Sequence, residues 1–288
     1  MRVFAPELPH PNLSALRAFA SLRERGEAVS HVMAAALIGI LLLAAAGFGI
    51  ASWRRRHTTT ESPFPAHWRE LIKRRLPHYA WLDAGQRERL RRHVQRFLAD
   101  KTFYGCNGLA ITEEMRVLIA GLACLLVLRP NAKPFPRLRS VLLYPEAFWV
   151  HHPEPDELGL VSDVPVLQIG ESWSETRVVL SWEDVEAALA GGETNVVAHE
   201  FAHQLDDEDT AEGAPHLADY TRWSKIMCDA YDNLCKHGSP VLDDYGAEGP
   251  GEFFAVATES YFQRGAELKQ HHPELYALLR DYYGIETV

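Results

Sequence analysis

Cysteine is scarce in this sequence. Only four occur among 288 residues, at positions 106, 124, 228 and 235, and none belongs to a C-x-x-C pair. This argues against a disulfide-rich secreted domain and against a structural zinc site, which normally uses a closed set of four Cys or His ligands. The thiols are expected to be reduced and to serve as small apolar side chains.

Positive charge is also in short supply. The chain has 29 Lys and Arg against 39 Asp and Glu, which gives a formal net charge of −10. The basic residues gather between Arg54 and Arg96, whereas acids predominate after residue 150. No broad basic face is expected in the globular part, so nucleic acid is not expected as a partner.

Residues 33–52, which contain no charged side chain, are the one apolar run long enough to cross a bilayer, because the run from Val117 to Leu128 is too short. Twenty helical residues span ~30 Å, the thickness of a bilayer core. Three arginines, Arg54 to Arg56, follow this run in place of a signal-peptide cleavage site. We therefore expect a single transmembrane helix in the inner (cytoplasmic) membrane, with the part of the chain that follows it in the cytoplasm by the positive-inside rule.

Four segments are predicted along the chain. Residues 1–32 are an extension, and because Met33 opens the apolar run directly, Met33 rather than Met1 is the expected translation start. Residues 33–52 form the transmembrane helix, 53–66 a basic flank and linker, and 67–288 one globular domain of ordinary size.

Periodicity predicts an α+β domain. Apolar stripes predict helices over 67–100, 113–128, 182–190, 220–237 and 271–283. Two β-branched runs, Ser140–Tyr144 and Arg177–Ser181, predict strands of a small mixed sheet.

The pattern H-E-x-x-H occurs at residues 199–203 and dominates the functional interpretation. On a helix, His199 and His203 lie one turn apart on the same face, where both imidazoles can bind one zinc ion. Glu200 can then act as general base on a zinc-bound water. Asn195 or Thr194 is the expected N-cap. The alternative is a helix with two surface histidines and a solvated carboxylate.

Catalytic zinc needs a third protein ligand. A nearby third histidine is lacking, since Asp206 and Asp209 occupy the positions that a metzincin motif gives to Gly and His. A second predicted helix, 251–262, carries Glu252 and Glu259 seven residues apart among phenylalanines. Carboxylates in such surroundings are costly to bury unless they are paired or bound to metal. The alternative is a surface helix with two scattered acids.

The combination of H-E-F-A-H-Q-L-D with a downstream E-F-F-A-V-x-x-E resembles the Mlc titration factor A family of zinc peptidases, which are gluzincins similar to the catalytic domain of anthrax lethal factor. Further matches are L-L-Y-P at 142–145, G-L-V at 159–161, G-E-S-W at 170–173 and V-L-S-W at 179–182. The resemblance covers about residues 65–285 and implies a zincin-like fold, in which substrate adds to a sheet edge beside the active-site helix.

Carried over residue by residue, the resemblance implies one Zn²⁺ per chain held by His199, His203 and Glu252, with Glu200 as general base. Glu259 would hold a ligand histidine in orientation. Tyr245, seven residues before Glu252, would donate a hydrogen bond to the oxyanion. The alternative for Tyr245 is an ordinary loop tyrosine.

These features predict a membrane-anchored zinc peptidase that acts on peptides or proteins, with aminopeptidase activity as one option. The resemblance also implies an alternative function, because the family takes its name from a protein that binds a transcriptional repressor and relieves repression. In that case binding would be primary and peptidase activity secondary. The intact His199, Glu200, His203 and Glu252 favour chemistry, because a pure binding protein has no need of Glu200 between two histidines.

Overall fold

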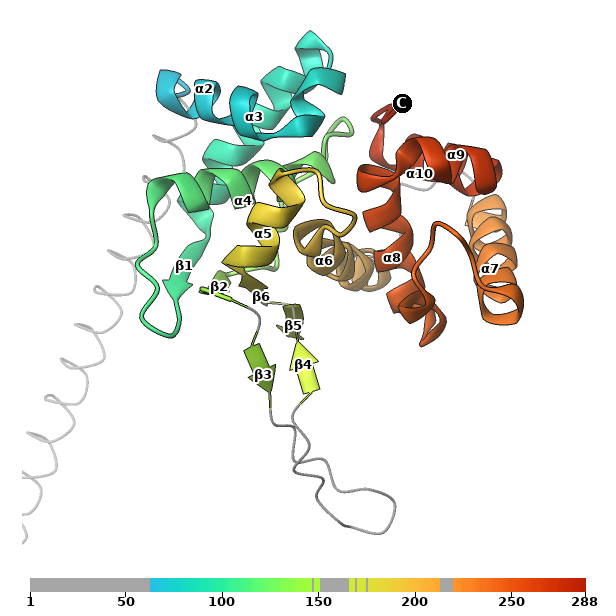
Figure 1. Cartoon of the computed structure of the whole chain (residues 1–288). Coiled ribbons are helices and arrows are strands. Elements are labelled where there is room, and N and C mark those ends of the chain that lie inside the picture. Colours follow the sequence, from blue (N-terminus) through green and yellow to red (C-terminus); the bar gives the residue numbers. More distant parts are fainter. Residues whose placement is uncertain (1–62, 147, 151–165, 169, 175, 213–219) are drawn as a thin grey trace, which may run out of the picture. The chain divides into compact units, whose positions relative to one another are not determined.

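The computed structural model describes residues 63–146, 148–150, 166–168, 170–174, 176–212 and 220–288 (Figure 1). Thr58–Val288 forms one compact unit, and residues 1–57 belong to a separate one. The expected extension 1–32, the expected transmembrane helix 33–52 and most of the linker 53–66 lie outside the described residues. No helix within the described ranges is long and apolar enough to cross a bilayer.

The first predicted helix, 67–100, is wrong as a continuous element. The structure has helix α2 (Ala66–Arg75), the 3-10 helix η1 (Pro77–Trp81) and helix α3 (Ala84–Asp100). Pro77 has no amide hydrogen to continue α2. Asp83 then restarts the helix through a capping box, accepting from Gln86 N at 2.7 Å while the Gln86 side chain accepts from Asp83 N at 2.8 Å.

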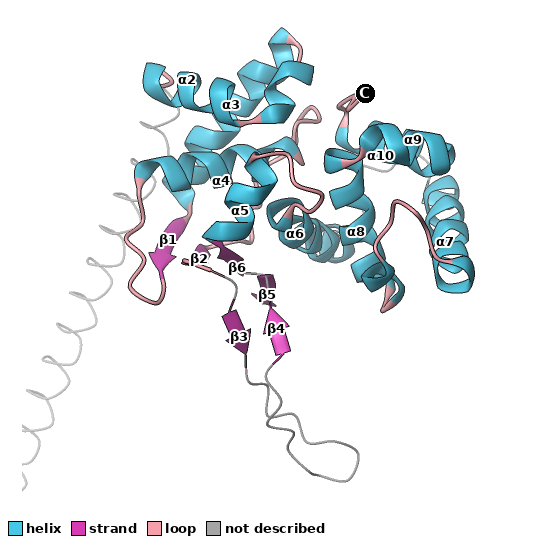
Figure 2. Ribbon diagram, in the orientation of Figure 1, coloured by secondary structure: helices cyan, strands magenta, loops and turns pink. Residues whose placement is uncertain are grey.

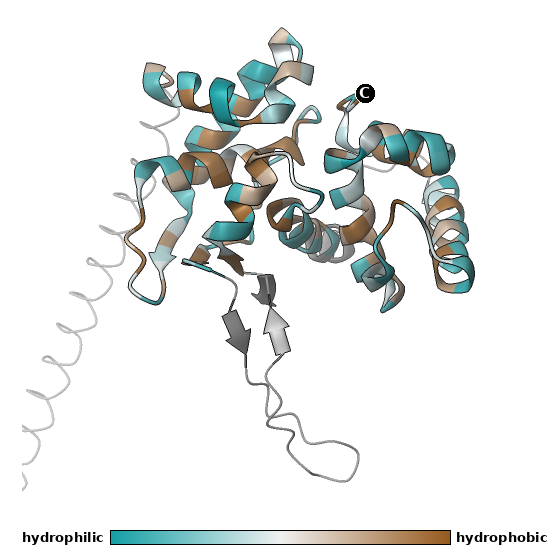
Figure 3. Cartoon of the chain, in the orientation of Figure 1, coloured by the Kyte–Doolittle hydropathy of each residue, from teal (hydrophilic) through white to brown (hydrophobic). Residues whose placement is uncertain are grey.

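Helix α4 (Glu113–Leu125) forms the centre of the N-terminal half. Every residue from Val117 to Leu125 is buried, which explains why the sequence shows an apolar run there and not a one-sided stripe. Helices α2 and α3 both pack against α4, and their outward turns are the more hydrophilic ones (Figure 3).

The predicted strands Ser140–Tyr144 (β2) and Arg177–Ser181 (β6) are confirmed, and the structure pairs them with each other in a mixed sheet of order β1-β2-β6-β5 (Figure 2). Thr102–Gly105 (β1) and β2 run parallel, as do β2 and β6, whereas Gly170–Ser174 (β5) is antiparallel to β6. Phe148–Val150 (β3) and Val166–Gln168 (β4) pair separately as an antiparallel ribbon.

The C-terminal half is helical. Its elements are α5 (Trp182–Leu189), α6 (Val196–Glu212), α7 (Tyr220–His237), η2 (Asp244–Ala247), α8 (Pro250–Gln263), α9 (Gly265–His271) and α10 (Pro273–Tyr283). Helix α6 lies between the β5–β6 edge of the sheet and α8. Phe201 of α6 packs on Phe135 with ring centroids 4.7 Å apart and on Phe97 at 5.8 Å, which joins the two halves in one core.

His78 in η1 is completely buried, with its ring edge-on to Trp81 at 4.8 Å and to Phe262 at 5.8 Å. Burial lowers the pKa of His78 to about 4 from 6.5. Between these values the unfolded chain binds the proton and the folded chain does not, so stability falls as pH falls. We expect wild type to lose about 2 kcal/mol more of unfolding free energy than His78→Leu between pH 7 and pH 5. Urea unfolding of the metal-free proteins measures this difference, and equal losses would contradict the burial of a neutral imidazole.

Candidate metal centre

Asn195, one of the two predicted N-caps, precedes helix α6, which begins at Val196. Asn195 is buried, and its Oδ1 accepts a hydrogen bond from Ala198 N at 3.0 Å. The cap fixes the first turn, so that His199 and His203 follow on one face with ring centroids 5.0 Å apart. Both rings are only partly exposed, at 14% and 20% of their side-chain surface.

Helix α8 brings Glu252 to the two histidines from 49 residues further along the chain. Its Oε2 lies 3.3 Å from His199 Nε2 and 3.3 Å from His203 Nε2. These three side chains offer ligand atoms that all lie within 4.8 Å of one another. The structure therefore brings together all three residues that the resemblance implies as metal ligands.

The arrangement passes a simple test of fit to a metal. Glu252 Oε2 is buried yet makes no hydrogen bond of normal geometry, despite its closeness to two imidazole nitrogens. Two ligand atoms ~2.0–2.1 Å from a tetrahedral zinc ion lie ~3.3 Å apart. The two distances from Glu252 Oε2 have this value. Two imidazole nitrogens with one carboxylate oxygen therefore suit a metal ion that keeps one coordination position open.

Without metal, His199 and Glu252 form a charged pair. Burial lowers the pKa of His199, but contacts with Glu252 and Glu259 outweigh burial and raise it to about 10. Burial raises the pKa of Glu252, but His199 and His203 outweigh it and lower this pKa to about 2. A metal ion that binds here must displace the proton of His199, because only the neutral imidazole is a ligand.

Glu259 supports the cluster through contacts with His199 and Asn195. Its Oε2 lies 3.4 Å from His199 Nδ1, and its Oε1 accepts a 2.6 Å hydrogen bond from Asn195 N. One carboxylate thus contacts both the ring of His199 and the backbone at the start of α6. A carboxylate on Nδ1 directs Nε2 toward the centre of the cluster.

Gln263 is a site-supporting residue that the sequence interpretation missed. Its Nε2 donates to Gly192 O at 2.8 Å, and its Oε1 lies 3.5 Å from Asn195 Nδ2. Gln263 continues the face of α8 that carries Glu252 and Glu259, at spacings of seven and four residues. This spacing was visible in the sequence, but the loop before α6 that receives the amide was not.

Tyr245 lies beside the cluster on a firmly held segment. Its ring centroid is 6.0 Å from that of His199, with an angle of 31° between the rings, and the residue is 46% exposed. Tyr245 N donates to Asp243 Oδ1 at 2.9 Å. The next residue, Gly246, packs so closely that a Cβ would lie 3.1 Å from Leu234 and 3.3 Å from Val256. The tyrosine is therefore presented by a turn with little room to move.

Glu200 follows His199 on α6 and is only 4% exposed. Its charge also helps to raise the pKa of His199, after the larger effects of Glu252 and Glu259. The structure thus gathers His199, His203 and Glu252 at one place, with Glu200 next to His199 along α6, Tyr245 near the ring of His199 and Glu259 in contact with His199 Nδ1.

Comparison with known proteins agrees with this geometry. Residues 50–284 match the model of a family described as glucose-regulated metallo-peptidase M90. An uncharacterized Synechocystis protein is 40% identical over 247 residues, which cover 82% of this chain and 90% of that protein. Proteins named Mlc titration factor A are 30% identical in Cronobacter sakazakii (81% and 90% covered) and 32% identical in Serratia proteamaculans (76% and 86%). The chain therefore belongs to the M90 family of metallopeptidases, as the resemblance in its sequence predicted.

Proposed function

We propose that this protein is a zinc-dependent peptidase that hydrolyses peptide bonds with Glu200 as general base. The observation that carries the proposal is the convergence of His199 Nε2, His203 Nε2 and Glu252 Oε2, with 3.3 Å from the carboxylate oxygen to each nitrogen. Such a set holds one Zn²⁺ and leaves a coordination position open, as catalytic sites do and structural sites do not.

Zinc held by these three side chains supplies Lewis acidity, which polarises a carbonyl and lowers the pKa of water. Glu200 takes the proton from the attacking water and delivers it to the leaving amine. Glu259 and Asn195 hold the imidazole of His199 in the orientation that metal binding requires, through the contacts described above. Tyr245 donates a hydrogen bond from its hydroxyl to the oxyanion that forms at the carbonyl.

The sheet supplies a place for the substrate. Within the described residues, β5 is an edge strand, and it lies next to α6, which carries the two histidines. An extended peptide can add to such an edge through main-chain hydrogen bonds, which make little demand on sequence. We propose that the substrate peptide pairs with Gly170–Ser174 and continues past the cluster of His199, His203 and Glu252. Binding of the peptide's N-terminal end at this cluster would make the enzyme an aminopeptidase.

The proposed location of this chemistry is the cytoplasmic face of the inner membrane. The support is sequence alone: residues 33–52 are uncharged, and Arg54, Arg55 and Arg56 follow them. Carbonate extraction of membranes that contain the full chain tests the anchor. Retention in the pellet is expected for wild type, and release would contradict it.

The experiment that tests the peptidase uses residues 58–288 loaded with one equivalent of zinc and a mixed peptide library. New peptide termini are identified by mass spectrometry. We expect cleavage that depends on added zinc. Full-length protein in detergent should cleave the library at the same positions. Absence of cleavage by a protein that binds zinc would overturn the proposal.

Such an outcome would favour the alternative function. Relatives of this chain are named Mlc titration factor A, and a role in binding a transcriptional repressor is the alternative that this name supports. A pull-down with a candidate repressor, done with wild type and with Glu200→Gln, distinguishes the two functions, because binding alone has no need of the base.

Replacement of Tyr245 by Phe isolates the oxyanion contact. The ring and its contact with His199 remain, and only the hydroxyl is lost. We expect kcat to fall by about 10²-fold with zinc affinity unchanged, because loss of one oxyanion donor has this magnitude in other hydrolases. Steady-state kinetics and zinc titration measure the two quantities. An unchanged kcat would leave Tyr245 as an ordinary surface tyrosine.

A further inference from the structure

We infer that the outward face of α2 and α3 is a docking surface for a membrane leaflet rich in anionic phospholipid. The first observation is the segregation of charge along the chain. Residues 63–101 contain ten Lys or Arg and four Asp or Glu, whereas residues 102–288 contain 12 and 31. A basic pair of helices thus belongs to an otherwise strongly acidic protein. This local concentration of positive charge departs from the expectation that the globular part has no broad basic face.

The second observation is where these basic side chains lie. Arg69 and Lys73 are exposed one turn apart on α2, and Arg92 and Arg96 are exposed one turn apart on α3. The opposite faces of both helices are buried against α4 through Ile72, Leu90, Val94 and Phe97. These four basic side chains are therefore on the sides of the two helices that face away from the protein core.

Few acids offset this charge. Glu88 is already paired with Arg91, and Asp83 is occupied as the N-cap of α3. Glu70 is the remaining exposed acid on the two helices, and the partly buried Asp100 lies 3.7 Å from Arg96. On the neighbouring α4, Glu113 contacts His67 and accepts a hydrogen bond from Trp68 Nε1, and Glu114 pairs with Arg75. Burial lowers the pKa of His93 to about 4, and Arg92, Arg89 and Arg96 act in the same direction, which reflects the concentration of positive charge around α3.

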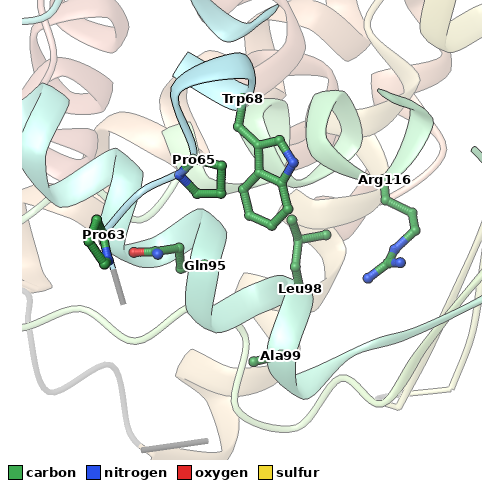
Figure 4. A pocket seen from close by; sticks show the side chains of 7 residues that line it. All are labelled: Pro63, Pro65, Trp68, Gln95, Leu98, Ala99 and Arg116. Carbon is green, nitrogen blue, oxygen red and sulfur yellow. The ribbon is translucent and has the colours of Figure 1, made fainter. Parts of the chain in front are cut away.

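The third observation is a hollow of about 290 Å³ at the same end of the domain, where the start of α2 meets the end of α3 (Figure 4). Its lining is apolar except for one amide and one guanidinium: Pro63, Pro65, Trp68, Leu98 and Ala99 with Gln95 and Arg116. An indole and a guanidinium beside apolar walls suit the boundary between phospholipid head groups and acyl chains.

The length of the chain makes this contact feasible. Residues 53–65 join the uncharged run 33–52 to α2, and 13 extended residues reach at most ~45 Å. If 33–52 spans the membrane as proposed, the basic face is held within that distance of the leaflet. Anionic lipid would then attract the exposed basic side chains of α2 and α3 across this short distance.

The test uses residues 58–288, the compact unit that lacks the apolar run, so that failure of the proposed anchor and failure of this inference are distinguishable. Cosedimentation is measured with vesicles of phosphatidylcholine alone and of phosphatidylcholine mixed with phosphatidylglycerol. We expect binding to the mixed vesicles only, and weakening as salt is raised. A variant with Arg69, Lys73, Arg92 and Arg96 all replaced by Glu should bind at least about a hundredfold more weakly.

The matched control replaces four exposed basic residues elsewhere, Lys133, Arg177, Lys225 and Lys236, by Glu. This control variant changes the net charge by the same amount as the first variant, and it should lose much less affinity for the anionic vesicles. Circular dichroism and zinc binding check that both variants fold. Three results would overturn the inference: no binding of wild type to anionic vesicles, equal loss in the two variants, or equally tight binding of a short DNA duplex, which would assign the face to nucleic acid.

Discussion

Replacement of Glu200 by Gln is expected to lower kcat for peptide hydrolysis by about 10³-fold while zinc remains bound. A positioned general base contributes 10²–10⁴-fold, and the amide cannot accept the proton of the attacking water. Glu200 is buried beside His199 and is not among the three residues whose atoms converge on the metal position. The metal should therefore be retained, which separates loss of the base from loss of the site.

Cleavage rates and zinc content of the same preparation measure both effects. Glu193→Gln is the matched control. Glu193 is exposed just before α6, so its replacement removes the same charge outside the cluster. The control should cleave as wild type does. A Glu200→Gln protein with full activity would show that another group takes the proton.

Replacement of Glu252 by Gln is expected to weaken zinc binding by at least about a hundredfold and to abolish cleavage. Changes to groups that only orient a ligand already cost 10–100-fold in metal affinity, and Glu252 supplies a ligand oxygen itself. The variant also removes the carboxylate that lies 3.3 Å from each histidine and that helps raise the pKa of His199. Isothermal titration with zinc measures the affinity.

Glu248→Gln, one turn earlier and exposed, is the control for charge on this segment. It should bind zinc like wild type. Unchanged affinity in Glu252→Gln would mean that the third ligand is elsewhere and that the closeness of α6 and α8 serves packing alone.

Much of the site could be predicted because its signal is local. The i and i+4 spacing of His199 and His203 places both on one face of any helix, and Asn195 before that helix is a typical cap. Glu252 is different: its seven-residue distance from Glu259 indicated a shared face, but the choice of Glu252 as ligand came from the family resemblance. The structure alone shows that Glu252 reaches both rings and that Glu259 reaches Nδ1 of His199.

The parts that were missed depend on long-range contacts or on very short elements. Strand β1 has four residues with little burial, and only its parallel pairing with β2, 38 positions along the chain, defines it. Helix α9 has seven residues, too few for a clear period. The break between α2 and α3 was visible in Pro77, but the apolar stripes on both sides of it masked the interruption. Gln263 is an ordinary polar residue until the loop at Gly192 folds against it.

The most direct test of the metal centre is anomalous diffraction at the zinc edge from crystals grown with one equivalent of zinc. We expect one peak per chain, within coordination distance of His199 Nε2, His203 Nε2 and Glu252 Oε2, with a fourth direction open to solvent. The charged pair of His199 and Glu252 should be replaced by two ligands of one ion. A peak elsewhere, or none in a protein that cleaves peptides, would contradict the account.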